Sequence, residues 1–443
     1  MRTFLSTWWD RLRSSYWFLP SIMSVAATAL SFFTVHIDTM INAKWARAAG
    51  WIWAGGPEGA RNVLATIAGS TITVAGVVFS ITIVALTLAS SQFGPRLLRN
   101  FMNDRWTQIV LGVFVATFLY SLLVLRTIRG TDASSFVPFL SVTCGLLFAV
   151  ASVGFLIFFI HHVPTSILAE NLIGRVAIEL QSRIDVLYPD RIGDSPREKK
   201  SDVAMQLPRA FAEEALPIPS EKSGFIQAID NDRLVALATR EGMVIRLCRR
   251  PGNFVSKDAS LAIAWPAEKM NAERCAQIND CYFFGLHRTP VQDIEYAVDQ
   301  LVEVAARALS PGINDPFTAM TCLEWLGVAL IQVGQRQIPS AAHFDQESHL
   351  RLISDVTDYA GIAAAVLNQI RLYGSTSMAV ITRMLDVIAR VATELKRPED
   401  REVLRGHTEA IREDGLRGAK NDRDKHDIEL AYDRALAGFN ATR

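Results

Sequence analysis

The sequence predicts an α-helical membrane protein with four transmembrane helices, followed by a cytoplasmic α+β region in which a small β-barrel or sandwich precedes a helical domain. Two observations support this fold class. All charge-free stretches of bilayer length begin before residue 134, and short β-like runs and amphipathic helical repeats follow them. Half of the 443 residues are hydrophobic and only 20% are charged, below the average of about 25% for soluble domains.

A bilayer crossing takes about 20 predominantly apolar residues, and four charge-free stretches reach that length. They run over residues 14–37, 62–95, 106–125 and 133–160. We therefore predict a four-helix transmembrane domain at residues 1–163, with the lipid bilayer as its partner.

The basic residues that flank these stretches predict the orientation. Four crossings place both chain ends on one side, where eight basic residues lie: Arg2, Arg11, Arg13, Arg96, Arg99, Arg105, Arg175 and Arg183. The opposite loops hold five: Lys44, Arg47, Arg61, Arg126 and Arg129. Short cytoplasmic flanks are enriched in Lys and Arg, so we expect the N- and C-termini in the cytoplasm.

The second stretch, residues 62–95, predicts a helix with unlike faces. Hydroxyl side chains recur along one face at three- and four-residue spacing; they are Thr66, Ser70, Thr73, Ser80 and Thr87. We call these five residues the hydroxyl seam. A seven-residue repeat drifts by only about 20° per heptad on a straight helix, so the seam stays aligned. Gly69 and Gly76 lie beside it, and Ile81 belongs to a neighbouring apolar face.

Two interpretations of the hydroxyl seam remain open. Small residues let transmembrane helices pack closely, and Ser and Thr hydroxyls can bond to carbonyls of their own helix. Alternatively, copies of this helix around a symmetry axis would line a water-filled path with hydroxyl groups.

Beyond the membrane region we predict three further segments. Residues 164–222 form a juxtamembrane helix and a proline-bearing linker, and residues 289–443 form a cytoplasmic helical domain. Residues 223–288 form a small β-barrel-like module, with strands expected at 224–230, 234–238, 243–248, 254–258, 261–265 and 281–286. Helices of the last segment are expected at 290–309, 346–373, 376–396, 399–412 and 423–440.

Part of the β module, RRPGNFVSKDASLAI at 249–263, resembles the turn-and-strand unit of barrel-sandwich modules that carry biotin or lipoate. Those modules attach the cofactor to a lysine that follows a methionine in a tight hairpin. Here Lys269 precedes Met270 instead. The module is therefore expected to be structural, and no cofactor is predicted for the chain.

One polar cluster flanks the helix that follows residue 290. Arg288, Gln292 and Asp293 stand near its start, and Asn314 and Asp315 follow its end, about 30 Å away along a straight helix. The two groups cannot form one site within a subunit unless another segment joins them. Capping of two helices accounts for the aspartates, and the alternative is a cytoplasmic contact with a ligand or another subunit.

Several chemistries find no support in the sequence. It contains no phosphate-binding glycine-rich loop, no zinc-binding HExxH and no nucleophile elbow. The five cysteines form no CxxC pair, and His161 and His162 have no carboxylate or cysteine at ligand spacing, so no metal site is predicted. The 45 basic and 45 acidic residues balance, which gives no argument for a nucleic-acid partner. We predict no catalytic residues and no enzymatic activity.

Two longer motifs are SSQFGPRLLRNFMNDR at 90–105 and RTPVQDIEYAVDQLVEVAARALSPGINDP at 288–316. Both resemble a bacterial family of predicted membrane proteins catalogued as domain of unknown function 2254, and the likeness extends over nearly the whole chain. The resemblance implies a multi-span N-terminal region, a cytoplasmic C-terminal region and a place in the bacterial inner membrane. It implies no activity, substrate or catalytic residue.

Two functions compete on these grounds. One is a homo-oligomeric ion channel or pore lined by the hydroxyl seam. The other is a membrane-anchored scaffold or sensor whose cytoplasmic domain binds a partner. The four stretches lack Asp, Glu, Lys and Arg, which argues against a proton-coupled carrier with an intramembrane acid and leaves a passive pore open.

Overall fold

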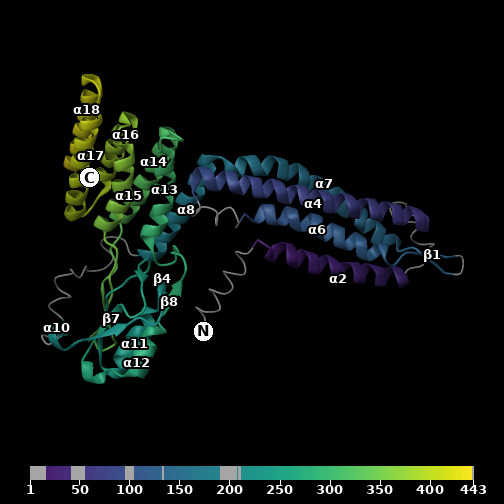
Figure 1. Cartoon of the computed structure of the whole chain (residues 1–443), viewed down its shortest axis with the longest axis horizontal. Helices are drawn as coiled ribbons and strands as arrows, with labels where there is room; N and C mark the ends of the chain where they lie inside the picture. Colours follow the sequence, from purple (N-terminus) through teal and green to yellow (C-terminus); the bar gives the residue numbers. More distant parts are fainter. Residues whose placement is uncertain are drawn as a thin grey trace. The chain divides into compact units, whose positions relative to one another are not determined.

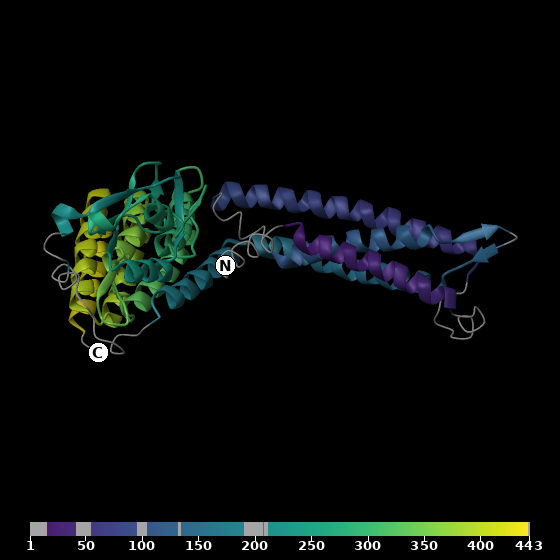
Figure 2. The same cartoon turned by 90° about the horizontal axis from the view of Figure 1, so that it is seen from below.

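The computed structural model describes residues 16–40, 55–94, 104–131, 134–189, 207 and 211–441. The chain forms two compact units, Met1–Asn171 and Leu172–Arg443, which Figures 1 and 2 show in two views. Most of the predicted linker within 164–222 lies outside the described residues, and so do residues 95–103 of the first motif.

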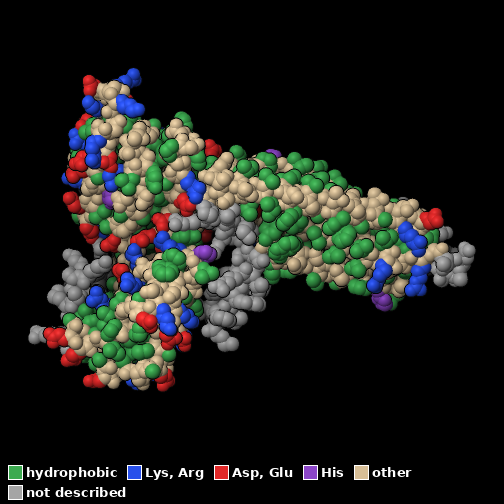
Figure 3. Space-filling view, viewed as in Figure 1, with side chains coloured by type: hydrophobic (Ala, Val, Ile, Leu, Met, Phe, Trp, Pro, Cys, Tyr) green, Lys and Arg blue, Asp and Glu red, His purple; other side chains and the backbone are tan. Residues whose placement is uncertain are grey.

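The first unit is a bundle of four long helices, seen side by side in Figures 1 and 2. They are α2 Phe18–Met40, α4 Pro57–Phe93, α6 Arg105–Leu125 and α7 Phe139–Ile167. Each of the four predicted stretches therefore contains a long helix, although the fourth, residues 133–160, is helical only from Phe139 and includes strand Ser134–Phe136. Each is long and apolar enough to cross a membrane, and Figure 3 shows hydrophobic side chains spread over the visible face of the bundle.

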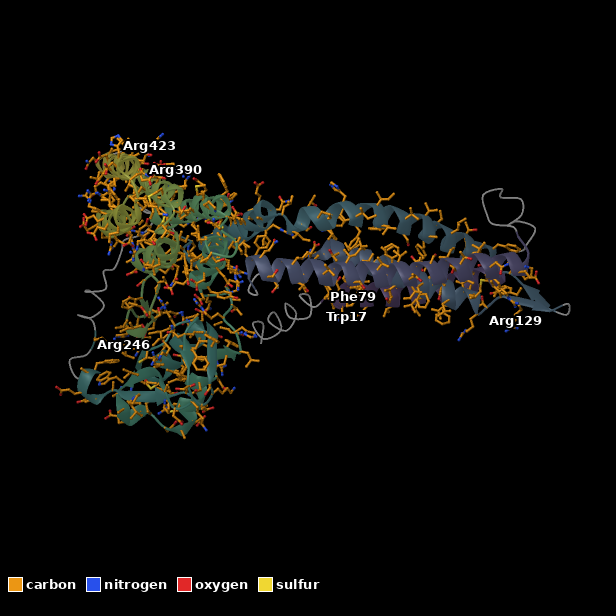
Figure 4. All side chains as sticks on the ribbon, turned by 45° about the horizontal axis from the view of Figure 1, so that its top comes forward. Trp17, Phe79, Arg129, Arg246, Arg390 and Arg423 are labelled. Carbon is orange, nitrogen blue, oxygen red and sulfur yellow. The ribbon has the colours of Figure 1, made fainter. Side chains whose placement is uncertain are left out.

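A short antiparallel hairpin joins α6 to α7. Its strands are β1 Arg129–Thr131 and β2 Ser134–Phe136. Figure 4 shows Arg129 at this end of the bundle, away from Phe79 of α4 and from Trp17, which immediately precedes α2. Arg129 thus lies at one end of the apolar bundle, where a charged side chain can contact water.

Helix α6 holds the bundle together, because it packs against α2, α4 and α7. One apolar cluster contains Ala27, Ala60, Leu64, Tyr120, Val124, Ile128 and Val142. A second contains Ala75, Val78, Val110, Leu111, Phe114 and Phe159. Van der Waals packing of this kind is a main source of helix association in lipid, where apolar burial alone gives little driving force.

Hydroxyl pairs across the helices supplement this packing. The Tyr120 hydroxyl lies 2.9 Å from Thr34 Oγ1 on α2 and donates to the Ser141 carbonyl of α7 at 3.1 Å. Thr117 Oγ1 on α6 lies 3.2 Å from Ser152 Oγ on α7. Interhelical hydrogen bonds of this kind are worth about 0.6 kcal/mol on average in membrane bundles.

The second unit contains two sheets. The five-stranded sheet has the order β3 Leu216–Pro219, β7 Ser260–Trp265, β5 Val244–Leu247, β10 Leu350–Ile353 and β9 Ala342–Phe344. The three-stranded sheet has the order β6 Phe254–Val255, β4 Gly224–Ile229 and β8 Tyr282–Gly285. Among the described strands of these sheets, β5 and β10 pair in parallel and the other pairs are antiparallel. Both sheets contribute side chains, such as Ile226 and Ile245, to one apolar core.

The strand predicted at 234–238 is wrong. These residues lie in helix α11, Asn231–Glu241, and helix α12, Ala272–Asn279, precedes β8. The Asp230 side chain accepts from the Arg233 amide at the start of α11, and Gly242 ends it in the left-handed conformation at φ 62°. These two caps favour a helix, whereas a run of five apolar residues is compatible with either structure.

The helix predicted at 346–373 begins too early. Residues 342–353 form β9 and β10, and the helix, α15, covers Tyr359–Gly374. Leu350 and Leu352 are buried and Arg351 between them is less so, an alternation typical of a strand. The strands of the second unit therefore extend beyond residues 223–288, to Leu216 on one side and to Ile353 on the other. Among the described residues they form two open sheets, so the barrel form is not observed.

The remaining helices pack as a layered group. They are α8 Ala169–Leu187, α13 Ile294–Ala308, α14 Pro316–Gly334, α16 Met378–Glu394, α17 Pro398–Gly418 and α18 Asp422–Asn440. Neighbouring pairs such as α13 with α15 and α16 with α18 are in contact. Helix α14 is a fifth helix long and apolar enough to cross a membrane. It packs within this unit, where a Cβ at Gly327 would lie 2.6 Å from Val387 Cγ1 and one at Gly334 would overlap Leu395 Cδ2.

Candidate functional site

The hydroxyl seam lies on the outside of its own bundle. Its five members are all exposed on α4. The buried residues of α4 are Ala60, Leu64, Ile67, Ala68, Thr71, Ala75, Val78, Ala89 and Phe93. At about 100° per residue, the centres of these two sets fall on nearly opposite sides of the helix. The face that the sequence marks by its hydroxyl groups is therefore not the one that packs within the chain.

Four members of the hydroxyl seam bond to their own helix. Thr66 Oγ1 donates to the Asn62 carbonyl at 2.7 Å, and Thr73 Oγ1 donates to the Gly69 carbonyl at 2.8 Å. Ser70 and Thr87 make equivalent bonds to Ile67 and Ile83. These bonds use the hydroxyl proton and leave oxygen lone pairs directed outward as acceptors.

The glycines of the bundle fall into two groups. A Cβ at Gly112 of α6 would lie 2.5 Å from Met23 Sδ, and one at Gly145 of α7 would lie 3.0 Å from Leu64 Cδ2. Gly69 and Gly76, beside the hydroxyl seam, have open space at that position. Close packing within the chain thus explains why Gly112 and Gly145 have no side chain. It does not explain the glycines at positions 69 and 76.

The predicted cytoplasmic residues separate into two places. Arg288 forms a bidentate contact with Asp293, at 2.8 and 3.0 Å, and donates to Asp299 Oδ2 at 2.7 Å. Asp293 caps α13 by accepting from the Tyr296 amide. Gln292 donates to the Ile229 carbonyl at 3.2 Å and accepts from the Ile229 amide at 2.9 Å. This group joins the start of α13 to strand β4.

Asn314 and Asp315 lie past the other end of α13, whose 15 residues span roughly 22 Å. Asn314 has φ 50°, a left-handed conformation that asparagine tolerates better than most side chains. Asp315 caps α14 by accepting from the Phe317 and Thr318 amides. The structure therefore does not bring these two residues together with Arg288, Gln292 and Asp293.

A polar centre that the sequence did not reveal surrounds Arg250. Its guanidinium donates to Thr357 Oγ1 at 2.8 Å and to Glu295 Oε1 at 2.7 Å. Burial raises the pKa of the Glu295 carboxyl above its ordinary value, and Arg250 opposes that shift. The partners are 45 and 107 positions from Arg250, so no local motif could have indicated them. The only local signal was the Pro251-Gly252 turn.

Gly252 allows this turn to approach α13. It has φ 94°, and a Cβ there would overlap the Asp293 carboxylate. Glycine is thus required both for the conformation and for the space. The turn, the cap of α13 and the segment that holds Thr357 are consequently held against one another.

A cavity of about 230 Å³ lies where these segments meet. Its lining comes from the end of α8, the β4–α11 junction, the Arg250 turn, the start of α13 and the segments around β9 and β10. Those residues are Leu187, Tyr188, Ile229, Asn231, Leu247, Arg250, Pro251, Gln292, Asp293, Ile294, Pro339, Ser340, His343, Ser354, Asp355, Val356 and Thr357. The cavity is large enough for several water molecules or for a small organic molecule.

His162 has a partner that local spacing did not indicate. Its Nε2 lies 2.7 Å from Asp104 Oδ2, which also accepts from Thr107 Oγ1. The contact joins the end of α7 to the start of α6. Within the described residues no group of three His, Cys, Asp or Glu side chains is arranged to hold a metal ion.

Comparison with known proteins identifies the family. The family profile described as "Predicted membrane protein (DUF2254)" matches residues 13–390. The chain belongs to this family. The DUF2254 match covers the hydroxyl seam, the Arg250 centre and the cavity, and it ends within α16.

Relatives of this DUF2254 protein occur in mycobacteria. Uncharacterised proteins of Mycobacterium tuberculosis strain H37Rv and of Mycobacterium bovis are each 30% identical over 405 residues, covering 88% of this chain and 74% of the relative. No solved structure matches the chain. The family description and the apolar helices of the first unit together show a membrane protein.

Proposed function

We propose that this protein is a homo-oligomeric ion channel of the bacterial inner membrane, with the hydroxyl seam of α4 lining its path. The observation that supports the proposal is the exposure of Thr66, Ser70, Thr73, Ser80 and Thr87 on the outside of the single-chain bundle. A polar face directed into lipid would leave acceptor oxygens without partners. A path shared among several copies would supply water or a permeating ion instead.

Symmetry follows from the position of the seam. Because it faces away from α2, α6 and α7, one chain cannot enclose it, and several copies around an axis can. The open space at Gly69 and Gly76 would let neighbouring helices approach closely beside the path. The proposal assigns no catalysed reaction, cofactor or nucleic-acid partner to the chain.

The lining chemistry suits passive conduction. Helix α4 has no charged side chain between Asn62 and Phe93, so no fixed charge would trap an ion within the membrane. Seam oxygens whose protons are held by the helix would act as weak acceptors and favour a cation over an anion. Weak binding at several levels permits an ion both to enter and to leave.

The proposed topology has four membrane helices and both termini in the cytoplasm. We assign α14 to the cytoplasmic domain because it packs against α13 and α16 of the second unit. Cysteine labelling with a membrane-impermeant reagent in intact cells tests this assignment. Glu58→Cys, at the start of α4, should be labelled, and Asp422→Cys, at the start of α18, should not. Labelling at both positions would indicate that α14 crosses the membrane.

Ser80→Leu tests the conduction path. We expect the variant to assemble normally, as judged by gel filtration, and to lose most of its ion flux in liposomes because leucine narrows the path. Ile81→Leu, which keeps leucine at the adjacent exposed position, should leave flux unchanged. Normal flux in an assembled Ser80→Leu protein would contradict the proposal. Loss of assembly would instead indicate that the seam is a packing surface.

A membrane-anchored sensor or scaffold is the second candidate. The cavity beside Arg250 supports it, because small ligands bind in concave sites with a few convergent polar groups. Absence of flux in the unmodified protein, together with ligand binding at the cavity, would favour this alternative.

A further inference from the structure

We propose that the cavity beside Arg250 binds a small organic cation that donates hydrogen bonds, such as a protonated amine. The inference goes beyond the proposed channel and does not depend on it. It rests on which of the polar lining groups already have partners within the chain, on the charge of the lining and on the volume.

Most of the polar lining groups bond to one another or to the backbone. Arg250 is held by Thr357 and Glu295, and Gln292 pairs with both backbone groups of Ile229. The Tyr188 hydroxyl donates to the Thr357 carbonyl at 2.9 Å. Such groups define the shape of the cavity and have less capacity left for a ligand.

His343 and Ser354 are also paired with each other. The His343 Nε2 atom lies 3.1 Å from Ser354 Oγ. Burial lowers the pKa of the His343 imidazole below its ordinary value, so this ring is neutral at neutral pH. It therefore adds no positive charge to the lining.

Two side-chain acceptors that line the cavity have no partner among the described residues. Asn231 Oδ1 is buried and has no hydrogen-bond partner, although it lines the cavity. The Asp355 carboxylate is exposed, and no described residue forms a hydrogen bond or ion pair with it. A buried acceptor without a partner is costly, so a ligand that donates to Asn231 Oδ1 would remove that cost. Asp355 stands where the cavity meets solvent and would receive a charged end.

The balance of charge also favours a cation. The lining contains one positive side chain, Arg250, and two negative ones, Asp293 and Asp355. The ion-pair partners just behind the lining are Glu295, Arg288 and Asp299, which together carry one negative charge. A net charge of −2 remains, and it would be neutralised by two ammonium groups.

The volume favours a small ligand. About 230 Å³ is below the roughly 300 Å³ at which pockets for drug-sized molecules begin. A four-carbon diamine, which has six non-hydrogen atoms, is small enough. Its two ends offer donors for both the Asn231 oxygen and the Asp355 carboxylate, which line the same cavity.

Calorimetry with three four-carbon compounds tests the inference on the full-length protein in detergent. Putrescine carries two ammonium groups, 1,4-butanediol carries two neutral hydroxyl groups and succinate carries two carboxylates. We expect putrescine to bind and the other two to give no signal. Binding of the diol or of succinate as tightly as putrescine, or no binding of putrescine, would overturn the proposal.

Three variants assign the binding to the cavity. Asp355→Asn should weaken putrescine binding about tenfold, because a charge-assisted hydrogen bond is replaced by a neutral one. Asn231→Asp should strengthen it, and an acidic residue in the first turn of α11 is compatible with the helix. Asp422→Asn, at a fully exposed position on α18, is the matched control and should have no effect. Equal weakening in Asp355→Asn and Asp422→Asn would place the binding elsewhere and overturn the assignment.

Discussion

The interior of the membrane bundle and the outer face of α4 contain the same kinds of residue and use them differently. In the interior, Tyr120 contacts Thr34 and Ser141 on two other helices, and a side chain at Gly145 would press on Leu64. On the outer face, Thr73 bonds only to its own helix at Gly69, and Gly76 has open space. The presence of small and hydroxylated residues therefore does not by itself indicate whether they contact another helix of the chain.

The bundle interior and the outer face of α4 differ in where their residues find neighbours. The interior residues named above have their neighbours on other helices of the same chain. Among the described residues, the seam hydroxyls that form hydrogen bonds form them within α4. The proposed path between subunits would account for the outer face, and substitutions that distinguish the two sets can test it.

The largest effect is expected at Gly145. Gly145→Leu should lower the stability of the bundle by about 1–3 kcal/mol, because extra atoms in a packed interior force neighbours to move. Gly76→Leu is the matched control and should not lower the stability of the isolated subunit, since glycine is intrinsically poor in helices. Thermal unfolding in a detergent that separates subunits measures both. Equal destabilisation would show that the two glycines occupy similar environments after all.

A smaller effect is expected at Tyr120. Tyr120→Phe removes the hydroxyl shared with Thr34 and Ser141 and should cost about 0.6–1.7 kcal/mol, the range of interhelical hydrogen bonds in membranes. Thr73→Val, which removes an exposed hydroxyl of similar size, should change the stability of the subunit by less than about 0.5 kcal/mol. The same thermal unfolding measurement applies. A loss at Thr73 as large as that at Tyr120 would mean that the seam supports the fold of the single chain.

Sequence reasoning located the membrane helices because their signal is local. A charge-free run such as residues 62–95 is long enough to cross a bilayer regardless of what surrounds it. The strand predicted at 234–238 failed because a short apolar run has no single periodicity, and the caps Asp230 and Gly242 decide for a helix. Strand β10 was missed although its neighbour β9 is close in the chain, and its pairing with β5, about one hundred positions earlier, needed the structure.

The two candidate sites also differ in whether their signal is local in the sequence. The hydroxyl seam was visible in the sequence because its spacing repeats along one helix. The Arg250 centre was not, because its contacts with Glu295 and Thr357 join three segments that are far apart in the chain. Arg288 and Asp293 belong to the polar cluster noted in the sequence, but the contacts of Arg288 with Asp293 and Asp299 needed the structure.

The sequence alone determined that apolar helices of bilayer length occupy the first 170 residues, that one of them carries a hydroxyl-rich face, and that strands and amphipathic helices follow. These features depend on composition and spacing, which act over a few turns of chain. Only the tertiary structure decided which face of α4 is buried, which glycines are confined and where a polar cavity opens. Those outcomes depend on contacts between distant segments, because burial and hydrogen bonding are properties of pairs of residues that the fold alone brings together.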